Sequence, residues 1–403
     1  MKYITRSLET VLHRAVRKFP VVVLTGPRQS GKTTLLRHNF GKSHRYLSLE
    51  PPDVQAAARE DPRGFLASYP PPVVFDEVQY APVLLPYIKE QVDAHRTRAG
   101  QFILTGSQNI LLAQGVTESL AGRAAMLRLF PLTLREMAGA PGAPLPWEKG
   151  SPDGRRLAGR RLWESFLRGG YPELAARGKR DASLWHASYL QTYLERDVRT
   201  IRQIGEFSQF QVFLRMLAAR SAQLLNLTGM SRDLGVAVNT IKAWLSVLEA
   251  TYQIVLLRPY FANIGKRLVK LPKVYFSDVG TLCYLVGLKD AEHAKAGPMA
   301  GAIMETAVVS EVFRTVVHRG EEPRVYFWRT STGTEVDLVV ETRAGLVPIE
   351  VKVSATPSRS MARGIEDFRK NLGERSTRGY VVHPGDIRLP LGPDAVAWPL
   401  AEM

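Results

Sequence analysis

The chain of 403 residues is longer than one hydrophobic core usually supports, so we expect two or three domains. Apolar residues make up 45% and charged residues 23% of the chain, which excludes wholesale disorder. The apolar runs, such as Val21 to Leu24, fall far short of the ~18 residues that span a bilayer, so we expect no membrane partner. The single cysteine, Cys283, excludes an intramolecular disulfide framework and a cysteine-based zinc finger.

The charge of the chain gives a first indication of its partners. There are 54 Lys and Arg residues against 38 acidic ones, a formal net charge of +16, and the first fifty residues contain ten basic and two acidic residues. Such an excess attracts phosphate backbones and favours a nucleic-acid partner, although a basic surface can also serve solubility alone. The first twenty residues are charged and contain no apolar signal core, so we expect a cytoplasmic protein.

The predicted elements follow one another along the chain. Residues 1–20 have the pattern of an amphipathic helix. Helical stretches then alternate with short apolar runs, which predicts a parallel sheet covered by helices; the runs are Val21–Leu24, Tyr46–Leu49, Val73–Phe75 and Phe102–Leu104. A Gly- and Pro-rich stretch at 138–154 predicts a boundary, a helical region follows to about 255, and strand signals then return. We therefore expect an α/β fold with domains at 1–140, 155–255 and 256–403.

The sequence from Gly26 to Thr33 has the form of a phosphate-binding loop, GxxxxGK[ST], between an apolar strand and a helix start. Its glycines let backbone N–H groups turn toward a β-phosphate, Lys32 reaches the β- and γ-phosphate oxygens, and the Thr33 hydroxyl is a ligand for Mg²⁺. We therefore predict that the chain binds ATP and Mg²⁺. The residues assigned to the nucleotide are Gly26, Pro27, Arg28, Gln29, Ser30, Gly31, Lys32, Thr33 and Thr34.

Two later apolar runs end in polar residues that suit the same chemistry. One run ends in Asp76 and Glu77, and we expect Asp76 to organise Mg²⁺ and Glu77 to activate the attacking water. The next run is followed by Ser107 and Asn109, either of which can orient that water, although a plain turn has the same composition.

The chain resembles the AAA+ ATPases, and most closely the bacterial and archaeal group that joins this core to a C-terminal domain of unassigned function. The resemblance covers nearly the whole length and rests on TGPRQSGKTTL, VVFDEVQ, FILTGSQN, SLAGR followed by LFPLTLREM, GGYPE, YLERDVR, TEVDLVV and PIEVK. It implies a homo-oligomer in which Arg123 is the finger donated to the γ-phosphate at a neighbouring subunit, a task that the rigid guanidinium fork suits. The alternative for Arg123 is a surface arginine at a helix end.

Residues 224–257 have the helix, turn, helix and strand pattern of a winged helix. Residues 230–236 form a short helix that ends in glycine, Asn239 can cap the second helix, and residues 251–257 form the wing strand. The apolar positions of the second helix have helical spacing; they are Ile241, Trp244, Leu245 and Leu248. Lys242 is the cation that the exposed face of this helix offers, so reading of DNA bases has weak support and protein contact is the alternative.

A second chemical pattern lies in residues 325–352. A hairpin would bring Asp337 beside Glu350, and strand alternation places Glu350 and Lys352 on one face, with Glu305 on a helix upstream. The pattern is similar to the D…ExK arrangement of restriction-endonuclease-like folds, where carboxylates hold Mg²⁺ and a lysine orients water for phosphodiester cleavage. The resemblance thus implies metal ligands at Glu305, Asp337 and Glu350 and a catalytic Lys352, but such domains also serve as binding platforms. An internal ion pair on a charged sheet would use the same residues.

The sequence therefore predicts a Mg²⁺-dependent ATPase that acts on or with DNA. One alternative is a nucleotide-gated protein-interaction switch with an inactive nuclease-like domain, and another is an ATP-regulated, Mg²⁺-dependent nuclease. Stimulation of ATP turnover by DNA separates the first from the second, and metal-dependent cutting identifies the third.

Overall fold

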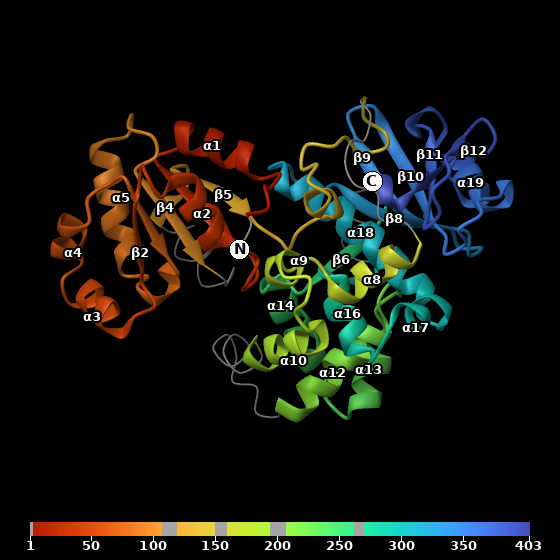
Figure 1. Cartoon of the computed structure of the whole chain (residues 1–403), viewed down its shortest axis with the longest axis horizontal. Helices are drawn as coiled ribbons and strands as arrows, with labels where there is room; N and C mark the ends of the chain where they lie inside the picture. Colours follow the sequence, from red (N-terminus) through yellow and green to blue (C-terminus); the bar gives the residue numbers. More distant parts are fainter. Residues whose placement is uncertain (1–2, 107–118, 150–158, 194–206, 262–269) are drawn as a thin grey trace.

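The N-terminal part of the chain is a parallel five-stranded sheet with helices on both faces (Figure 1). The computed structural model describes residues 3–106, 119–149, 159–193, 207–261 and 270–403. The strand order is β2-β3-β4-β1-β5, and all four pairings are parallel. The strands are β1 (Val21–Thr25), β2 (Arg45–Ser48), β3 (Val73–Asp76), β4 (Phe102–Gly106) and β5 (Ala124–Arg128). The prediction of a parallel sheet is confirmed, whereas β5 lies outside the predicted runs.

Alternate side chains of β1 pack into two different helical layers. Val21 and Val23 pack with α3, α4 and α5, while Val22 and Leu24 pack with α1 and α2. The helices are α1 (Glu9–Lys18), α2 (Lys32–Phe40), α3 (Pro52–Glu60), α4 (Pro62–Ser68) and α5 (Leu84–Ala94). Because β1 is buried on both faces, its sequence is a continuous apolar run and not an alternating one.

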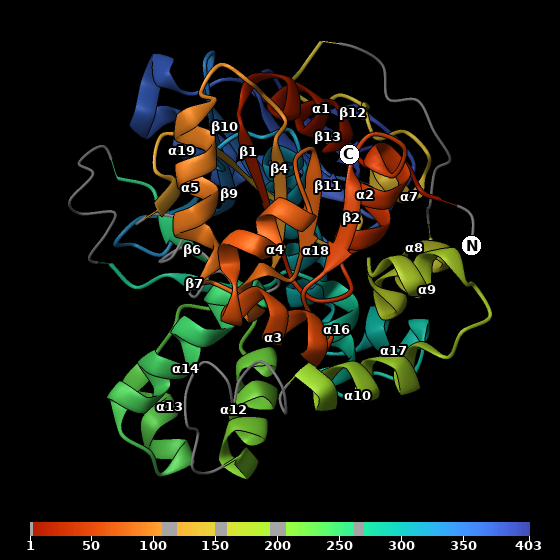
Figure 2. The ribbon, with the colours of Figure 1, turned by 90° about the vertical axis from the view of Figure 1, so that its left-hand side faces the viewer.

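Helix α7 (Leu134–Met137) follows β5, and a group of mostly short helices that comes after it gathers at one end of the molecule (Figure 2). These helices are α8 (Arg160–Arg168), α9 (Pro172–Ala176), α10 (Ala182–Tyr193), α12 (Phe207–Ala219), α13 (Leu227–Leu234), α14 (Val238–Ala250), α16 (Val279–Leu285) and α17 (Ala291–Ala296). Among the helices described, none combines the length and the apolar composition needed to cross a membrane.

Helices α13 and α14 occupy the segment for which a helix, a turn and a second helix are predicted. The four apolar positions expected to face the core of α14 are all buried; they are Ile241, Trp244, Leu245 and Leu248. The predicted cap at Asn239 is wrong, because α14 begins at Val238 and residue 239 already lies in its first turn. The following strand begins at Ile254 and not at Thr251, since Tyr252 has a positive φ of 62° that interrupts an extended chain.

The C-terminal part is an eight-stranded sheet in the order β12-β13-β11-β10-β9-β8-β6-β7. Its strands are β6 (Ile254–Pro259), β7 (Lys273–Phe276), β8 (Val325–Arg329), β9 (Glu335–Thr342), β10 (Gly345–Val351), β11 (Gly379–His383), β12 (Leu389–Pro390) and β13 (Ala395–Pro399). Helix α18 (Ala300–His318) packs on one face and α19 (Arg363–Leu372) on the other. The antiparallel pair β9 and β10 has Ile349 opposite Leu338, a register that brings Asp337 next to Glu350.

Candidate functional site

The loop between β1 and α2 depends on two glycines. Gly26 has a φ of 146°, and a Cβ atom there would lie 2.1 Å from the carbonyl oxygen of Leu129. Gly31 has a φ of 97° and immediately precedes α2. Both conformations suit glycine and disfavour other residues, so the loop can pass tightly beside β5 and turn into the helix. The N-terminal end of α2 therefore lies at the end of the loop, where the positive end of the helix dipole favours an anion.

The predicted phosphate- and magnesium-binding side chains converge at the C-terminal edge of the parallel sheet. The Lys32 ammonium donates to the carbonyl oxygens of Gly26 at 2.9 Å and Pro27 at 3.0 Å, so it is held within the loop. The Thr33 hydroxyl donates to a carboxylate oxygen of Asp76 at 2.8 Å. Lys32 and Asp76 are both buried. An ammonium, a hydroxyl and a carboxylate are thus gathered at the ends of β1 and β3.

Two side chains that the sequence analysis did not select orient Asp76. The Tyr46 hydroxyl donates to one of its carboxylate oxygens, and the Thr105 hydroxyl donates to the other. Burial, and then the bond to Asp76, raises the pKa of Tyr46 above its ordinary value. Tyr46 lies on β2 and Thr105 on β4, the strands that flank β3. Tyr46 begins one predicted strand and Thr105 directly follows another, and both strands belong to the same predicted parallel sheet as the strand that ends in Asp76. That shared sheet is the signal by which they could have been selected from the sequence.

Glu77 leaves the end of β3 in a conformation that turns it out of the strand. Its φ is 60°, its N–H donates to the Thr105 hydroxyl at 3.1 Å, and its carboxylate accepts from the side-chain amide of Gln79. It is half-buried, so a water molecule can reach it. The other residues predicted at this edge, Ser107 and Asn109, lie outside the described residues.

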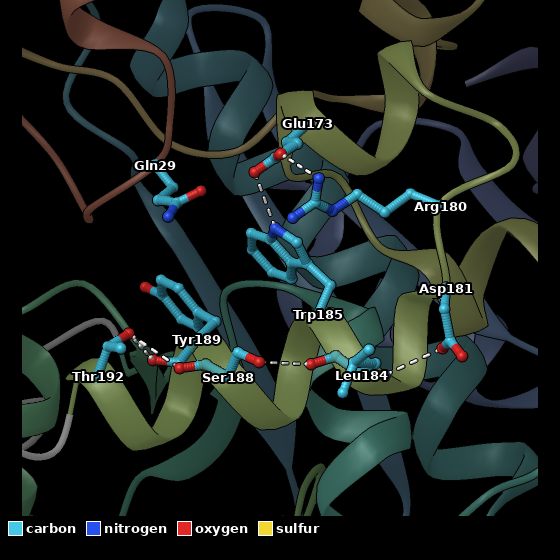
Figure 3. Close-up of a pocket in the computed structure, with 9 residues that line it drawn as sticks. All are labelled: Gln29, Glu173, Arg180, Asp181, Leu184, Trp185, Ser188, Tyr189 and Thr192. Carbon is cyan, nitrogen blue, oxygen red and sulfur yellow. Dashed lines mark hydrogen bonds and ion pairs between the residues drawn. The ribbon is translucent and has the colours of Figure 1, made fainter.

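The remaining residues of the loop differ in their exposure. Pro27 and Ser30 are buried, Arg28 is half-buried, and Gln29 and Thr34 are exposed. Gln29 borders a hollow of about 370 Å³, whose other walls are formed by α9, α10 and the turn between them (Figure 3). The lining residues are Gln29, Glu173, Arg180, Asp181, Leu184, Trp185, Ser188, Tyr189 and Thr192. The exposed side of the loop therefore faces α10 across open space.

Glu173, from the GGYPE sequence, organises the wall opposite Gln29. Its carboxylate accepts from the Trp185 indole N–H at 3.0 Å and pairs with Arg180 at 2.8 Å (Figure 3). The preceding Pro172 lies so close to Gly31 that a Cβ built on that glycine would be 3.4 Å from the proline ring. The GGYPE segment thus packs directly against the phosphate-binding loop.

Arg6 ties the loop to the C-terminal part of the chain. This buried guanidinium donates to the carbonyl oxygens of Ser30 at 2.9 Å and Phe130 at 2.6 Å, and it lies 3.2 Å from the Glu136 carboxylate. His318, at the end of α18, lies 3.2 Å from the same carboxylate. Burial alone would raise the pKa of Glu136, but Arg6, His318 and the Thr133 N–H together outweigh burial and hold that pKa well below its ordinary value. The loop backbone is therefore fixed by a charged network that reaches into α18.

Tyr252 makes a second connection between the loop and the C-terminal part. Its hydroxyl donates to the hydroxyl of Thr25, the last residue of β1, at 2.7 Å. Its carbonyl oxygen accepts from the Ser277 hydroxyl at 2.6 Å, just after β7. The hairpin of β6 and β7 is thus anchored at the strand that leads into the phosphate-binding loop.

Arg123 lies at the opposite edge of the sheet from the phosphate-binding loop of its own chain. It immediately precedes β5, and its carbonyl oxygen accepts from the N–H of Val21 at the start of β1. Its guanidinium makes two bonds to the Asp93 carboxylate, at 2.7 and 2.9 Å, and these bonds lower the pKa of Asp93 to about 2. The structure therefore does not bring Arg123 together with Lys32 within one chain.

Helix α18 and strands β9 and β10 bring four carboxylates together, which we call the carboxylate cluster: Glu305, Glu335, Asp337 and Glu350. One oxygen each from Glu305, Glu335 and Asp337 lies within 4.8 Å of the other two. Asp337 accepts from the backbone N–H of Val351 at 2.8 Å, and Glu350 pairs with Lys352 at 2.7 Å. The four residues that the sequence predicts for this site, Glu305, Asp337, Glu350 and Lys352, therefore lie close together. Glu335 was missed, although strand alternation puts it on the face of Asp337.

Burial and mutual repulsion weaken the acidity of the cluster. Burial, and then the nearby Asp337, raises the pKa of Glu305 to about 7 and that of Glu350 to about 8. Burial also raises the pKa of Asp337. A cation brought into the cluster near neutral pH would therefore compete with protons for these oxygens.

Comparisons with known proteins divide the chain into three matched segments. Residues 18–138 match an AAA domain, residues 159–292 match a domain of unknown function (DUF8612), and residues 300–403 match another (DUF4143). The uncharacterized proteins Mb2031c of Mycobacterium bovis and Rv2008c of Mycobacterium tuberculosis are each 33% identical over 398 residues, which is 98% of this chain and 83% of the relative.

Two solved structures show weaker similarity. The Walker-type ATPase of Pyrococcus abyssi is 16% identical, with a TM-score of 0.42 over 70% of this chain and 96% of that one. The RuvB Holliday junction branch migration motor of Thermotoga maritima is also 16% identical, with a TM-score of 0.27 over 62% of this chain and 88% of that one. Scores this low add nothing to the fold described above, which stands on the strand order and on the match to the AAA domain.

Proposed function

Because this chain belongs to the same family as Mb2031c and Rv2008c and carries an AAA domain, we propose that it hydrolyses ATP with Mg²⁺ and acts on or with DNA. The domain match supports an AAA-type P-loop ATPase. The observation that carries the proposal is the meeting of Lys32, Thr33 and Asp76 at the end of β1 and β3, where the loop glycines let the backbone turn tightly into α2.

The side chains at this edge suit Mg²⁺ and a triphosphate. The Thr33 hydroxyl and the Asp76 carboxylate are hard oxygen ligands 2.8 Å apart, the type that Mg²⁺ prefers. When bound, Mg²⁺ neutralises charge on the β- and γ-phosphate oxygens. Lys32 exchanges its two loop carbonyls for phosphate oxygens, Tyr46 and Thr105 keep Asp76 in place, and Glu77 orients the attacking water and accepts its proton.

Arg123 acts in trans in this proposal, at the nucleotide of a neighbouring copy in a homo-oligomer. Its place at the edge of the sheet away from its own loop supports this assignment over an action within one chain. In the isolated chain, Asp93 pairs with the Arg123 guanidinium. Because this ion pair is partly exposed to solvent, little free energy is lost when the guanidinium leaves Asp93 for the γ-phosphate of a neighbouring copy.

Replacement of Glu77 by glutamine is expected to leave ATP affinity near its wild-type value and to lower turnover by about 10²- to 10⁴-fold, since the amide cannot accept the proton of the attacking water. Nucleotide binding by fluorescence and phosphate release under single-turnover conditions measure the two effects separately. Glu60→Gln removes the same charge from the exposed end of α3 and serves as the control. Turnover by Glu77→Gln close to that of the control would remove Glu77 from the mechanism.

A DNA partner is supported by the net charge of +16 and by the pair of helices α13 and α14. Leu224 forms an isolated bridge with Lys273 of β7, and β7 pairs with β6, so two strands and this bridge accompany the helices, which supports a winged-helix arrangement. Arg232 and Lys242 are exposed on the two helices and can contact phosphate.

ATP turnover is expected to rise when single-stranded, duplex or branched DNA is added, and the rise should shrink between low and physiological salt because phosphate contacts release counterions. The double variant Arg232→Ala with Lys242→Ala should lose part of the stimulation and keep the basal rate. Heparin at equal charge is the control for a mere polyanion effect. Equal rates with and without every DNA would contradict the DNA role and favour the protein-interaction switch.

The carboxylate cluster supports a second function, a divalent cation site in the C-terminal domain. We propose Glu305, Asp337 and Glu350 as its ligands, with Glu335 added by the geometry of the described residues. Carboxylate oxygens at this spacing suit Mg²⁺, which when bound would activate water for phosphodiester cleavage, with Lys352 placed beside Glu350 to orient that water. Strand cutting in the presence of Mn²⁺ would single out the nuclease alternative in the same DNA experiment.

A further inference from the structure

Lys273 is a buried cation inside the carboxylate cluster, and the sequence pattern does not point to it. It is the first residue of β7, and its side chain is only 5% exposed. Its ammonium lies 2.9 Å from a carboxylate oxygen of Glu305 and forms an ion pair with Glu335. The same ammonium lies 5.5 Å from the centre of the Phe327 ring, within the range of a cation–π contact.

The position of this ammonium coincides with the part of the cluster that suits a metal ion. Glu305, Glu335 and Asp337 are the residues whose oxygens lie within 4.8 Å of one another, and Lys273 pairs with two of the three. Tyr275, two residues along β7, donates to the oxygen of Glu305 that Lys273 contacts, at 2.6 Å. The described residues thus already supply the cluster with a cation and with hydrogen bonds to its oxygens.

We propose that Lys273 is the resident counter-ion of the carboxylate cluster and competes with a divalent metal ion for it. This inference rests on the C-terminal cation site proposed above. An ammonium and a divalent ion cannot share the oxygens of Glu305 and Glu335 without strong repulsion in a site of low dielectric constant. The metal ion therefore enters only when the Lys273 ammonium withdraws, and the free energy of the ion pairs opposes its binding.

The backbone around Lys273 makes that withdrawal costly. Lys273 pairs with Leu257 of β6 and forms a bridge with Leu224, so its Cα atom is held from two sides. The ammonium also forms ion pairs with Glu305 and Glu335, so its withdrawal breaks both contacts.

The test is Mn²⁺ binding by the full-length, nucleotide-free protein, followed through the electron paramagnetic resonance signal of free Mn²⁺. Lys273→Met keeps the length of the side chain and removes its charge, and is expected to bind Mn²⁺ about tenfold more tightly than the wild type, or better still. Lys273→Arg keeps the cation and should remain as weak as the wild type. Lys370→Met, which removes an equal charge from the exposed face of α19, should change nothing.

Adding Asp337→Asn to Lys273→Met should abolish the gained affinity, which assigns the bound ion to the cluster. Equal and tight Mn²⁺ binding by the wild type and Lys273→Met would overturn the competition and keep the metal site. No binding by either protein would overturn the metal site together with the inference.

A second measurement on the wild type does not depend on the folding of any variant. Acetic anhydride should label Lys273 slowly in the metal-free protein, because its ammonium is buried and paired, and several times faster at saturating Mn²⁺. Labelling of Lys370, read by mass spectrometry in the same sample, corrects for changes in the reagent. An unchanged rate at Lys273 in protein that has bound Mn²⁺ would show that the ammonium stays in place, and the competition would then be wrong.

Discussion

Replacement of Lys32 by alanine is expected to abolish nucleotide binding. In the free protein this buried ammonium bonds to the carbonyl oxygens of Gly26 and Pro27, and we expect it to exchange them for phosphate oxygens when ATP binds. Two charge-assisted hydrogen bonds at about 1.5–3 kcal/mol each correspond to a loss of affinity of about 10²-fold or more. Calorimetric titration with a non-hydrolysable ATP analogue measures the effect.

Lys42→Ala is the matched control, since Lys42 is an exposed lysine just beyond the end of α2. Because Lys32 also bonds to two carbonyl oxygens of its own loop, its replacement removes contacts that stabilise the loop. Circular dichroism and a melting curve should therefore accompany the titration to show that the variant is folded. A folded Lys32→Ala protein that binds nucleotide as tightly as Lys42→Ala would contradict the assignment of the loop.

Replacement of Arg123 by alanine is expected to lower ATP turnover by about 10³-fold while nucleotide affinity stays the same, the effect of losing a finger that stabilises the transition state. Steady-state turnover and nucleotide titration give the two quantities. Mixing Arg123→Ala with Glu77→Gln subunits should restore part of the activity, because some interfaces then combine an intact finger with an intact Glu77. Co-assembled mixtures without any recovery would speak against an action in trans.

The ion pair with Asp93 supplies a sharp control for this experiment. If Arg123 served only to bind Asp93, then Asp93→Ala would lose as much activity as Arg123→Ala. If Arg123 acts at a neighbouring nucleotide, Asp93→Ala leaves the guanidinium intact and turnover stays within a few-fold of the wild type. Arg96→Ala removes the other arginine that contacts Asp93, at 3.1 Å, and should leave turnover unchanged.

The parts that could be predicted from the sequence are those that short segments encode by themselves. The spacing of Gly26, Gly31, Lys32 and Thr33 fixes the loop, since each residue acts on the backbone or the helix start next to it. Strand alternation likewise places Glu350 and Lys352 on one face, and a short hairpin brings Asp337 to them. Both patterns depend on geometry that repeats within a few residues.

Contacts between distant segments were decided only by the tertiary structure. Tyr46 and Thr105 hold Asp76 because β2 and β4 flank β3, an order that no local pattern states. Arg6 reaches Phe130 across 124 positions of the chain, and Tyr252 reaches Thr25 across 227. No motif around any of these side chains indicates its partner. The burial of the side chain and the identity of its partner therefore depend on how distant segments pack.

Lys273 and Arg123 show the same division between local and long-range information. A lysine at the start of a short strand carries no sequence signal, yet the pairing of β7 with β6 places Lys273 among carboxylates from α18 and β9. The sequence singles out Arg123 by its motif, but only the fold reveals that it lies across the sheet from its own phosphate-binding loop. Local sequence thus determined which chemistry the chain carries, because motifs act through neighbouring backbone. Packing decided which charges meet, because strand order and helix docking set distances between residues far apart in the chain.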